Sequence, residues 1–321
     1  MLELNVLSPI LLWTAIAIYA AAFVAYAFDL ARRSQVTADA RSEAELVGVG
    51  ARGNAYAADA SVPAPAQGFV MARIGTSLTV LAFLFHLAAT VTRGIAAGRV
   101  PWANLYEFGM IGTLLVVAVF LAVLTRLDLR FLGTFIIGLV VVLLGGAATS
   151  FYVAVVPLMD PLKSIWLIIH VFVASLGTAF FALAFALSVI QLMQARRERL
   201  VGENAAKTGP GFLRTLPGSD RLESLAYRFT IVGFILWTFT LIAGAIWAQD
   251  AWGRYWGFDV KETWTFVIWV IYAGYIHARA TRGWRGSRSA WLAIVGFSAV
   301  IFNFTIVNVF FKGLHAYSGL S

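Results

Sequence analysis

About eight apolar stretches constrain the fold of this chain more than any other feature, because each is long enough to cross a bilayer as a helix. A spanning segment must satisfy its backbone polar groups internally, which favours helices. The composition agrees, since 60% of the residues are hydrophobic and 12% are charged, against about half and about a quarter in soluble domains. The sequence therefore predicts an all-α polytopic membrane protein. The expected spans are 8–29, 72–94, 105–125, 131–153, 164–194, 226–248, 262–280 and 289–311.

These stretches divide the chain into three parts. Residues 1–30 hold the first transmembrane helix, 31–71 form a polar, Ala-rich cytoplasmic linker, and 72–321 form a membrane domain with the other seven helices. The first residues lack the basic n-region of a cleavable signal peptide, so we expect the first helix to remain in the mature protein.

The distribution of Lys and Arg predicts the orientation. Alternating the predicted spans places 18 of the 24 Lys and Arg residues on one side of the membrane and 6 on the other. The positive-inside rule assigns the richer side to the cytoplasm. Both termini and the loop at 248–264 then face outward from a multi-pass protein of the plasma (inner) membrane. The net charge of +8 thus reflects the positive-inside distribution of Lys and Arg, and no nucleic acid partner is expected.

The outward loop is unusually rich in aromatic rings. Five of the eleven tryptophans lie in or beside it, interleaved with acidic and basic residues. An interfacial aromatic belt explains one or two such rings, but not this density. Flat aromatic walls edged by charges suit a large planar ligand that carries its own charged groups.

Four histidines are the candidate metal ligands. His86 and His277 lie within predicted helices, where ionisable residues are costly and usually functional. His170 lies near the outer end of its helix, and His315 follows the last one. Depth sorts them into an inner pair, His86 with His277, and an outer pair, His170 with His315. Paired imidazoles are a common way to hold haem iron, although a lone intramembrane histidine also serves as an interhelical hydrogen-bonding group. Counting places His277 nearer the cytoplasm than His86, so the inner pair requires tilted helices.

The loop sequence Trp252-Gly-x-x-Trp256-x-Phe258-Asp259-x-Lys-Glu-Thr-Trp264 resembles the tryptophan-rich WWD signature of haem-handling proteins. The match is nearest to the CcsA/ResC type of system II cytochrome c biogenesis. Four further landmarks agree in order, around His86 with 98–107, 166–170, 269–279 and 313–317. Two residues depart from the pattern, because Phe258 replaces a usual Trp and Val260 a common Pro. Phe keeps a stacking face but lacks the indole N–H donor.

The resemblance implies a path for non-covalent haem b. Haem would be collected at a membrane site bounded by His86 and His277 and presented at an outer site ligated by His170 and His315. It would then be joined to the Cys-x-x-Cys-His motif of an apocytochrome c on the extracytoplasmic face. The residues expected to bind the haem at the outer site are Trp252, Trp256, Phe258, Asp259 and Trp264.

The charged residues of the loop leave alternatives open. Arg254 or Lys261 would pair with haem propionates, or would be solvated interface charges. Asp259 and Glu262 stand where a helix begins, and a structural role at its N-terminus is favoured over proton transfer.

The resemblance also implies partners. These are a ResB-type membrane protein with a large outer domain, a thioredoxin-like thiol reductant and membrane lipid. The chain has no cysteine and therefore no thiol chemistry of its own, so we expect it to work within a cytochrome c synthase complex, with no catalytic residue assigned. Two alternatives remain: a bis-histidine diheme b-type subunit that exchanges electrons with quinone, and a transporter for another aromatic ligand.

Overall fold

The computed structural model describes residues 2–50, 70–155, 158, 160–203, 210–311 and 313–315. This part of the chain is helical, with no strand, as the sequence predicts. The long helices are α1 (Leu2–Gly50), α2 (Val70–Ala97), α3 (Leu105–Leu124), α4 (Gly133–Ser150), α5 (Ile165–Glu203), α6 (Ser219–Trp252), α7 (Val260–Arg282) and α8 (Ser287–Phe304). The short ones are η1 (Arg130–Leu132), η2 (Asp160–Lys163), η3 (Gly211–Thr215) and α9 (Ile306–Phe310).

Seven segments of the described chain are long and apolar enough to cross a membrane, and they correspond to seven of the predicted spans. The remaining one, α7, has 23 residues, which at about 1.5 Å per residue is also long enough. Its sequence is more polar than those of the other seven, with Thr263, Thr265, His277 and Arg279 along it. The prediction of an all-α polytopic membrane protein is confirmed.

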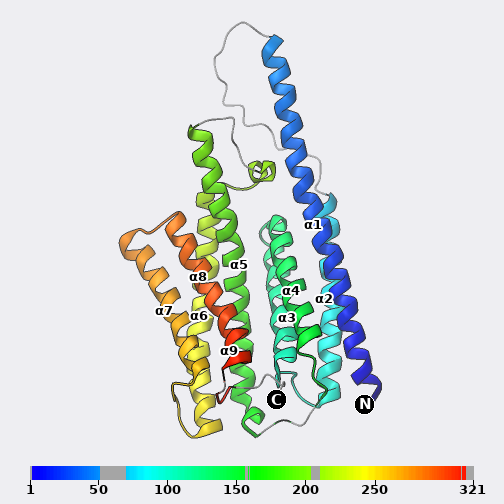
Figure 1. The fold of residues 1–321 in the computed structure, drawn as a ribbon, viewed down its shortest axis with the longest axis vertical. Coiled ribbons are helices and arrows are strands. Elements are labelled where there is room, and N and C mark those ends of the chain that lie inside the picture. The colour runs from blue at the N-terminus through cyan, green and yellow to red at the C-terminus, as the bar shows by residue number, and fades with distance from the viewer. Residues whose placement is uncertain are drawn as a thin grey trace.

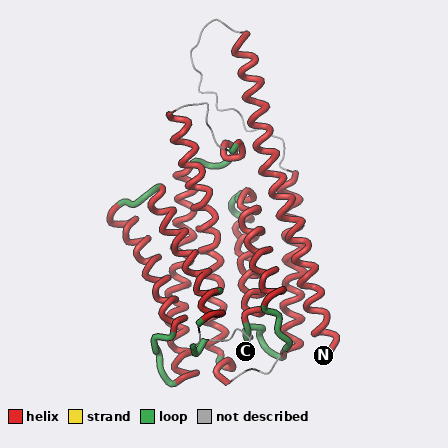
Figure 2. Tube along the Cα trace, viewed as in Figure 1, coloured by secondary structure: helices red, strands yellow, loops and turns green. Residues whose placement is uncertain are grey.

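The helices form an elongated bundle (Figure 1). α1 packs along α2, α5 packs along α6, and α3 and α4 lie between these pairs, while α7 lies at the edge away from α1. The start of α1, the loop between α6 and α7, and α9 share one end of the bundle (Figure 1), which we call the loop end. Figure 2 shows connecting loops in green at both ends. The start of α1 and the last described residues, 313–315, therefore lie at the same end as the Trp-rich loop, and which face of the membrane this end occupies stays a prediction.

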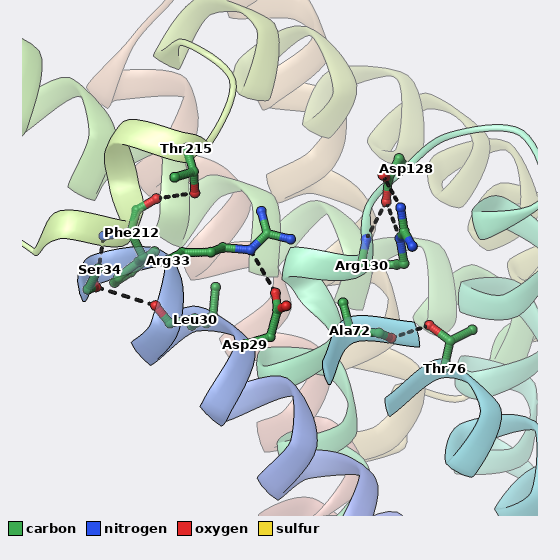
Figure 3. Close-up of polar contacts among 10 residues, drawn as sticks. All are labelled: Asp29, Leu30, Arg33, Ser34, Ala72, Thr76, Asp128, Arg130, Phe212 and Thr215. Carbon is green, nitrogen blue, oxygen red and sulfur yellow. Dashed lines mark hydrogen bonds and ion pairs between the residues drawn. The ribbon is translucent and has the colours of Figure 1, made fainter. Parts of the chain in front are cut away.

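α1 continues as a helix to Gly50, well past the predicted end at 29. Residues 31–47 contain neither Pro nor Gly, so nothing in this part of the predicted linker stops a helix. A buried ion pair between Arg33 Nε and Asp29 Oδ2, 2.7 Å apart, supports this extension. η3 packs on it, and the backbone N–H of Phe212 donates to Ser34 Oγ at 2.9 Å (Figure 3). The rest of the predicted linker, 51–69, lies outside the described residues.

A buried ion cluster joins α2 to α3 at the loop end. The Glu107 carboxylate, fully buried, accepts hydrogen bonds from Arg93 Nε at 2.9 Å and from Arg99 Nη1 at 2.7 Å. The backbone N–H of Ala103 donates to the same carboxylate at 2.8 Å, and Asn104 caps the first turn of α3. These contacts account for the landmark at 98–107. They also fix the start of α3, which lines the cavity described next.

Candidate functional site

A cavity of about 170 Å³ opens between α3, α5, α6 and α8 near the loop end. A smaller one of about 60 Å³ adjoins it, and His170, Thr240, Lys261, Thr265 and His315 line both. The larger cavity continues into the bundle past the small residues Gly112, Ala174 and Ser175. The two histidines of the predicted outer pair therefore line the same two cavities. One histidine comes from α5 and the other from the segment after α9.

His170 is fixed by the backbone of α6. Its Nδ1 lies 2.9 Å from the carbonyl oxygen of Thr240. A carbonyl only accepts hydrogen bonds, so Nδ1 carries the proton and donates, and Nε2 keeps its lone pair. Gly244 makes room for the ring, because a Cβ at this position would lie 2.7 Å from His170 Cε1.

His315 is fixed by a side chain instead. Its Nδ1 donates to Asp259 Oδ2 at 2.7 Å, and the backbone N–H of Leu314 donates to Asp259 Oδ1 at 3.2 Å. Burial alone would raise the pKa of Asp259, but these bonds outweigh it and leave that pKa below its usual value. Burial also lowers the pKa of His315, against the pull of Asp259. A neutral imidazole beside an ionised carboxylate again has its lone pair on Nε2.

Tryptophan rings surround both imidazoles. The Trp247 ring centroid lies 5.9 Å from that of His170 and 5.4 Å from that of His315. Trp252 lies 4.8 Å from Trp247 and 4.9 Å from His315, and Trp256 lines the smaller cavity. Two of the predicted aromatic residues, Trp252 and Trp256, thus lie with the outer pair.

Two other predicted aromatic residues do not line either of these cavities. Phe258 is 82% exposed and has a φ of 57°, which is unusual for a residue with a side chain. Trp264 packs against Phe302 in the interface of α7 with α8, with ring centroids 4.5 Å apart. A loop can turn neighbouring residues in different directions, and the motif alone does not show which rings face inward.

The start of α7 organises the loop. Asp259 is its N-cap residue, and Glu262 completes a capping box. Glu262 Oε2 accepts hydrogen bonds from the backbone N–H groups of Gly257 at 2.8 Å and Asp259 at 3.1 Å. Arg254 Nη1 lies 3.8 Å from the same oxygen. The structural role predicted for Asp259 and Glu262 is confirmed, and Asp259 additionally holds His315.

The predicted inner pair is not formed. His86 on α2 is fully buried against α1, where its Nδ1 lies 3.5 Å from the hydroxyl of Tyr19. His277 is exposed on α7. These two helices lie at opposite edges of the bundle (Figure 1), so in this structure one iron cannot bind both imidazoles. The position of a residue along its predicted helix indicates its depth in the membrane. It does not indicate which helices are neighbours.

Several residues of the cavity were not predicted. Thr240, Gly244 and Ala248 recur every four residues on α6 and so lie on one helical face. This spacing is visible in the sequence and could have indicated that face. Phe108 and Gly109 on α3 also line the larger cavity, and no sequence motif indicates that they would. Their part in the site depends on which helices pack together.

The fold and the site define a class: an all-α membrane protein with two imidazoles of the same tautomer at the aromatic end of its bundle. The family model described as cytochrome C assembly protein matches residues 102–315. This range includes His170, the Trp-rich loop and His315. The chain belongs to the cytochrome c assembly protein family.

Individual relatives agree with this assignment. The chain is 35% identical over 269 residues to the cytochrome c biogenesis protein CcsA of Guillardia theta, covering 77% of this chain and 86% of the relative. It is 39% identical over 178 residues to CcsA of Prochlorococcus marinus, where the match spans 50% of this chain and 56% of the relative. The solved structure of cytochrome c haem lyase CcmF has a similar fold, with a TM-score of 0.64 at 16% identity, over 94% of this chain and 46% of CcmF.

Proposed function

We propose that this protein handles haem and delivers it for covalent attachment to apocytochrome c during cytochrome c maturation. Membership of the cytochrome c assembly family and the similarity to CcsA proteins support this function. The observation that carries it is the outer pair. His170 and His315 line the same cavities, and each has its Nδ1 hydrogen-bonded, which leaves Nε2 available to a metal.

Haem is the substrate in this proposal, bound non-covalently as haem b. Axial imidazoles would hold its iron, and Trp247, Trp252 and Trp256 would supply stacking faces. The 170 Å³ cavity is below the roughly 300–1,000 Å³ of pockets for drug-sized ligands. We therefore infer that the cavity widens when haem binds, while the hydrogen bonds of Asp259 keep hold of residues 314 and 315.

The proposal extends to partners and location. A ResB-type membrane protein, an apocytochrome c with Cys-x-x-Cys-His and a thioredoxin-like reductant would act with this chain on the extracytoplasmic face of the inner membrane. Without cysteine, the chain supplies no sulfur for a thioether bond. His277 is exposed on α7. A haem bound there would take its second ligand from outside the described residues, and a membrane partner is well placed to provide it.

The electron-transfer alternative is not favoured. It requires two bis-histidine pairs within the bilayer, and α2 and α7, which carry His86 and His277, lie at opposite edges of the bundle. The family assignment also points to cytochrome c assembly rather than to a diheme subunit.

The proposed function is tested by co-expressing the chain with a ResB-type partner and an apocytochrome c. Covalent haem is then measured by peroxidase staining of denaturing gels. We expect His170→Ala and His315→Ala to abolish most of the attached haem, because each removes one axial ligand. Asp128→Asn, at an exposed ion pair away from the site, is the control and should leave it unchanged. Full haem attachment in the His170→Ala/His315→Ala double variant would contradict the proposal.

A further inference from the structure

Lys261 lies at the centre of the site without having a role in holding the histidines. It stands in the first turn of α7 and lines three adjoining cavities, each together with His315. Among the described residues that line these cavities, it is the one Lys or Arg. Its positive charge therefore faces the hollow in which the outer pair meets.

The charge of Lys261 has no carboxylate partner in the described part of the chain. Its Nζ donates to the amide oxygen of Asn308 at 2.5 Å. The neighbouring carboxylates are engaged elsewhere, Asp259 with His315 and Glu262 with the loop backbone. An ammonium group in an apolar cavity is costly without a counter-charge. An anionic group on a ligand would supply one.

Arg254, the other cation of the loop, is differently placed. Its guanidinium lies over Gly257 and 3.8 Å from Glu262 Oε2. It lines none of the three cavities. Arg254 therefore stabilises the loop, and Lys261 is left as the cation that a bound ligand meets.

We propose that Lys261 is a substrate-recognition residue that pairs with a carboxylate of the tetrapyrrole held between His170 and His315, that is, with a haem propionate. This inference rests on the proposed function and adds a substrate class to it: tetrapyrroles that carry free carboxylates. The iron-binding histidines recognise the metal, and Lys261 recognises the acidic edge of the macrocycle. Charge-assisted hydrogen bonds of this kind are stronger than neutral ones.

The test compares two ligands that differ only in whether the propionate carboxylates are free or esterified. Haem and haem dimethyl ester are titrated into the purified full-length chain in detergent, and the Soret band gives each dissociation constant. We expect the wild type to prefer haem by about tenfold or more. Lys261→Gln, which keeps a donor for Asn308, should bind the ester as the wild type does and should lose the preference for haem. Lys261→Arg should keep the preference.

The remaining outcomes distinguish the recognition role of Lys261 from haem binding itself. An unchanged preference in Lys261→Gln, or equal weakening of both ligands, would overturn the recognition role and leave haem binding intact. His170→Ala should weaken both ligands alike, because it acts on the iron. If neither ligand binds the wild type, the proposed function fails together with this inference. Thermal unfolding of each variant separates a binding defect from a folding defect.

Discussion

His170 and His315 lie at one cavity but are held in different ways. A backbone carbonyl of α6 fixes His170, whereas a carboxylate fixes His315. A backbone acceptor cannot be removed by mutation, but a carboxylate can be neutralised and the space around a ring can be filled. The two histidines can therefore be perturbed separately, by changing Asp259 for one and Gly244 for the other.

Asp259→Asn should weaken haem binding by about 10- to 100-fold, the usual effect of changing a group that orients a metal ligand. Asn is a good N-cap residue, so α7 should still form. The measurement is a haem titration followed at the Soret band, with thermal unfolding as the check on folding. An affinity equal to that of wild type would show that the hydrogen bond between Asp259 and His315 has no part in ligation.

Gly244→Ala should lower haem affinity by displacing the imidazole of His170, since the new methyl group would lie 2.7 Å from its Cε1. Gly145→Ala on α4 is the matched control, because no atom beyond its own stretch of helix lies within 4 Å of the corresponding position. Both changes should raise helix propensity by up to about 1 kcal/mol. Equal haem affinities in the two variants would contradict the contact between Gly244 and His170.

At the scale of elements, ion clusters tie the helices together at both ends of the bundle. Glu107 joins α2 to α3 at the loop end. At the opposite end Glu223 on α6 accepts hydrogen bonds from Arg279, from the backbone N–H of Gly286 and from Ser289. This second cluster holds the turn between α7 and α8 against α6. It positions α7, whose first turn carries Lys261.

Glu223→Ala should destabilise the protein by about 3–5 kcal/mol, because it leaves the largely buried guanidinium of Arg279 without a counter-charge. Asp128→Ala breaks an exposed pair with Arg130 and should cost no more than about 1 kcal/mol. Unfolding in mixed micelles monitored by tryptophan fluorescence compares the two. A loss below about 1 kcal/mol for Glu223→Ala would show that the cluster contributes little.

The sequence predicted the helices well and their packing poorly, for a physical reason. Long apolar runs mark helices by themselves, so seven spans and the start of α7 could be located. The outer pair was also found, because both histidines stand at helix ends on the same side. The separation of His86 from His277, the burial of Trp264 against Phe302 and the role of Gly244 depend on which helices adjoin. That information lies in contacts between distant segments.

At the scale of the whole molecule, the bundle has one aromatic end and one basic end. The start of α1, the Trp-rich loop and α9 lie together at the loop end (Figure 1). The positive-inside rule assigns the opposite end, rich in arginine, to the cytoplasm. In this orientation the cavity that we propose for haem lies near the outer surface, where an apocytochrome c would be met.

Because the chain has no cysteine of its own, single introduced cysteines test this orientation without background labelling. Asp250→Cys, at the loop end, should react with a membrane-impermeant maleimide in intact spheroplasts. Asp220→Cys, at the other end, should react only after the membrane is permeabilised. Both positions are exposed. Labelling of Asp220→Cys alone in intact spheroplasts would reverse the orientation.

The most direct test of histidine-ligated haem at the loop end is a reduced-minus-oxidised absorption spectrum. It is recorded for purified wild type, His170→Ala, His315→Ala and His86→Ala proteins, each produced with ample haem and a ResB-type partner, with and without added imidazole. We expect a b-type signal in wild type and in His86→Ala. That signal should fall in the two outer-pair variants and return with imidazole, which replaces the missing ligand. The absence of a haem band in wild type, or an undiminished band when both outer histidines are replaced, would contradict this expectation.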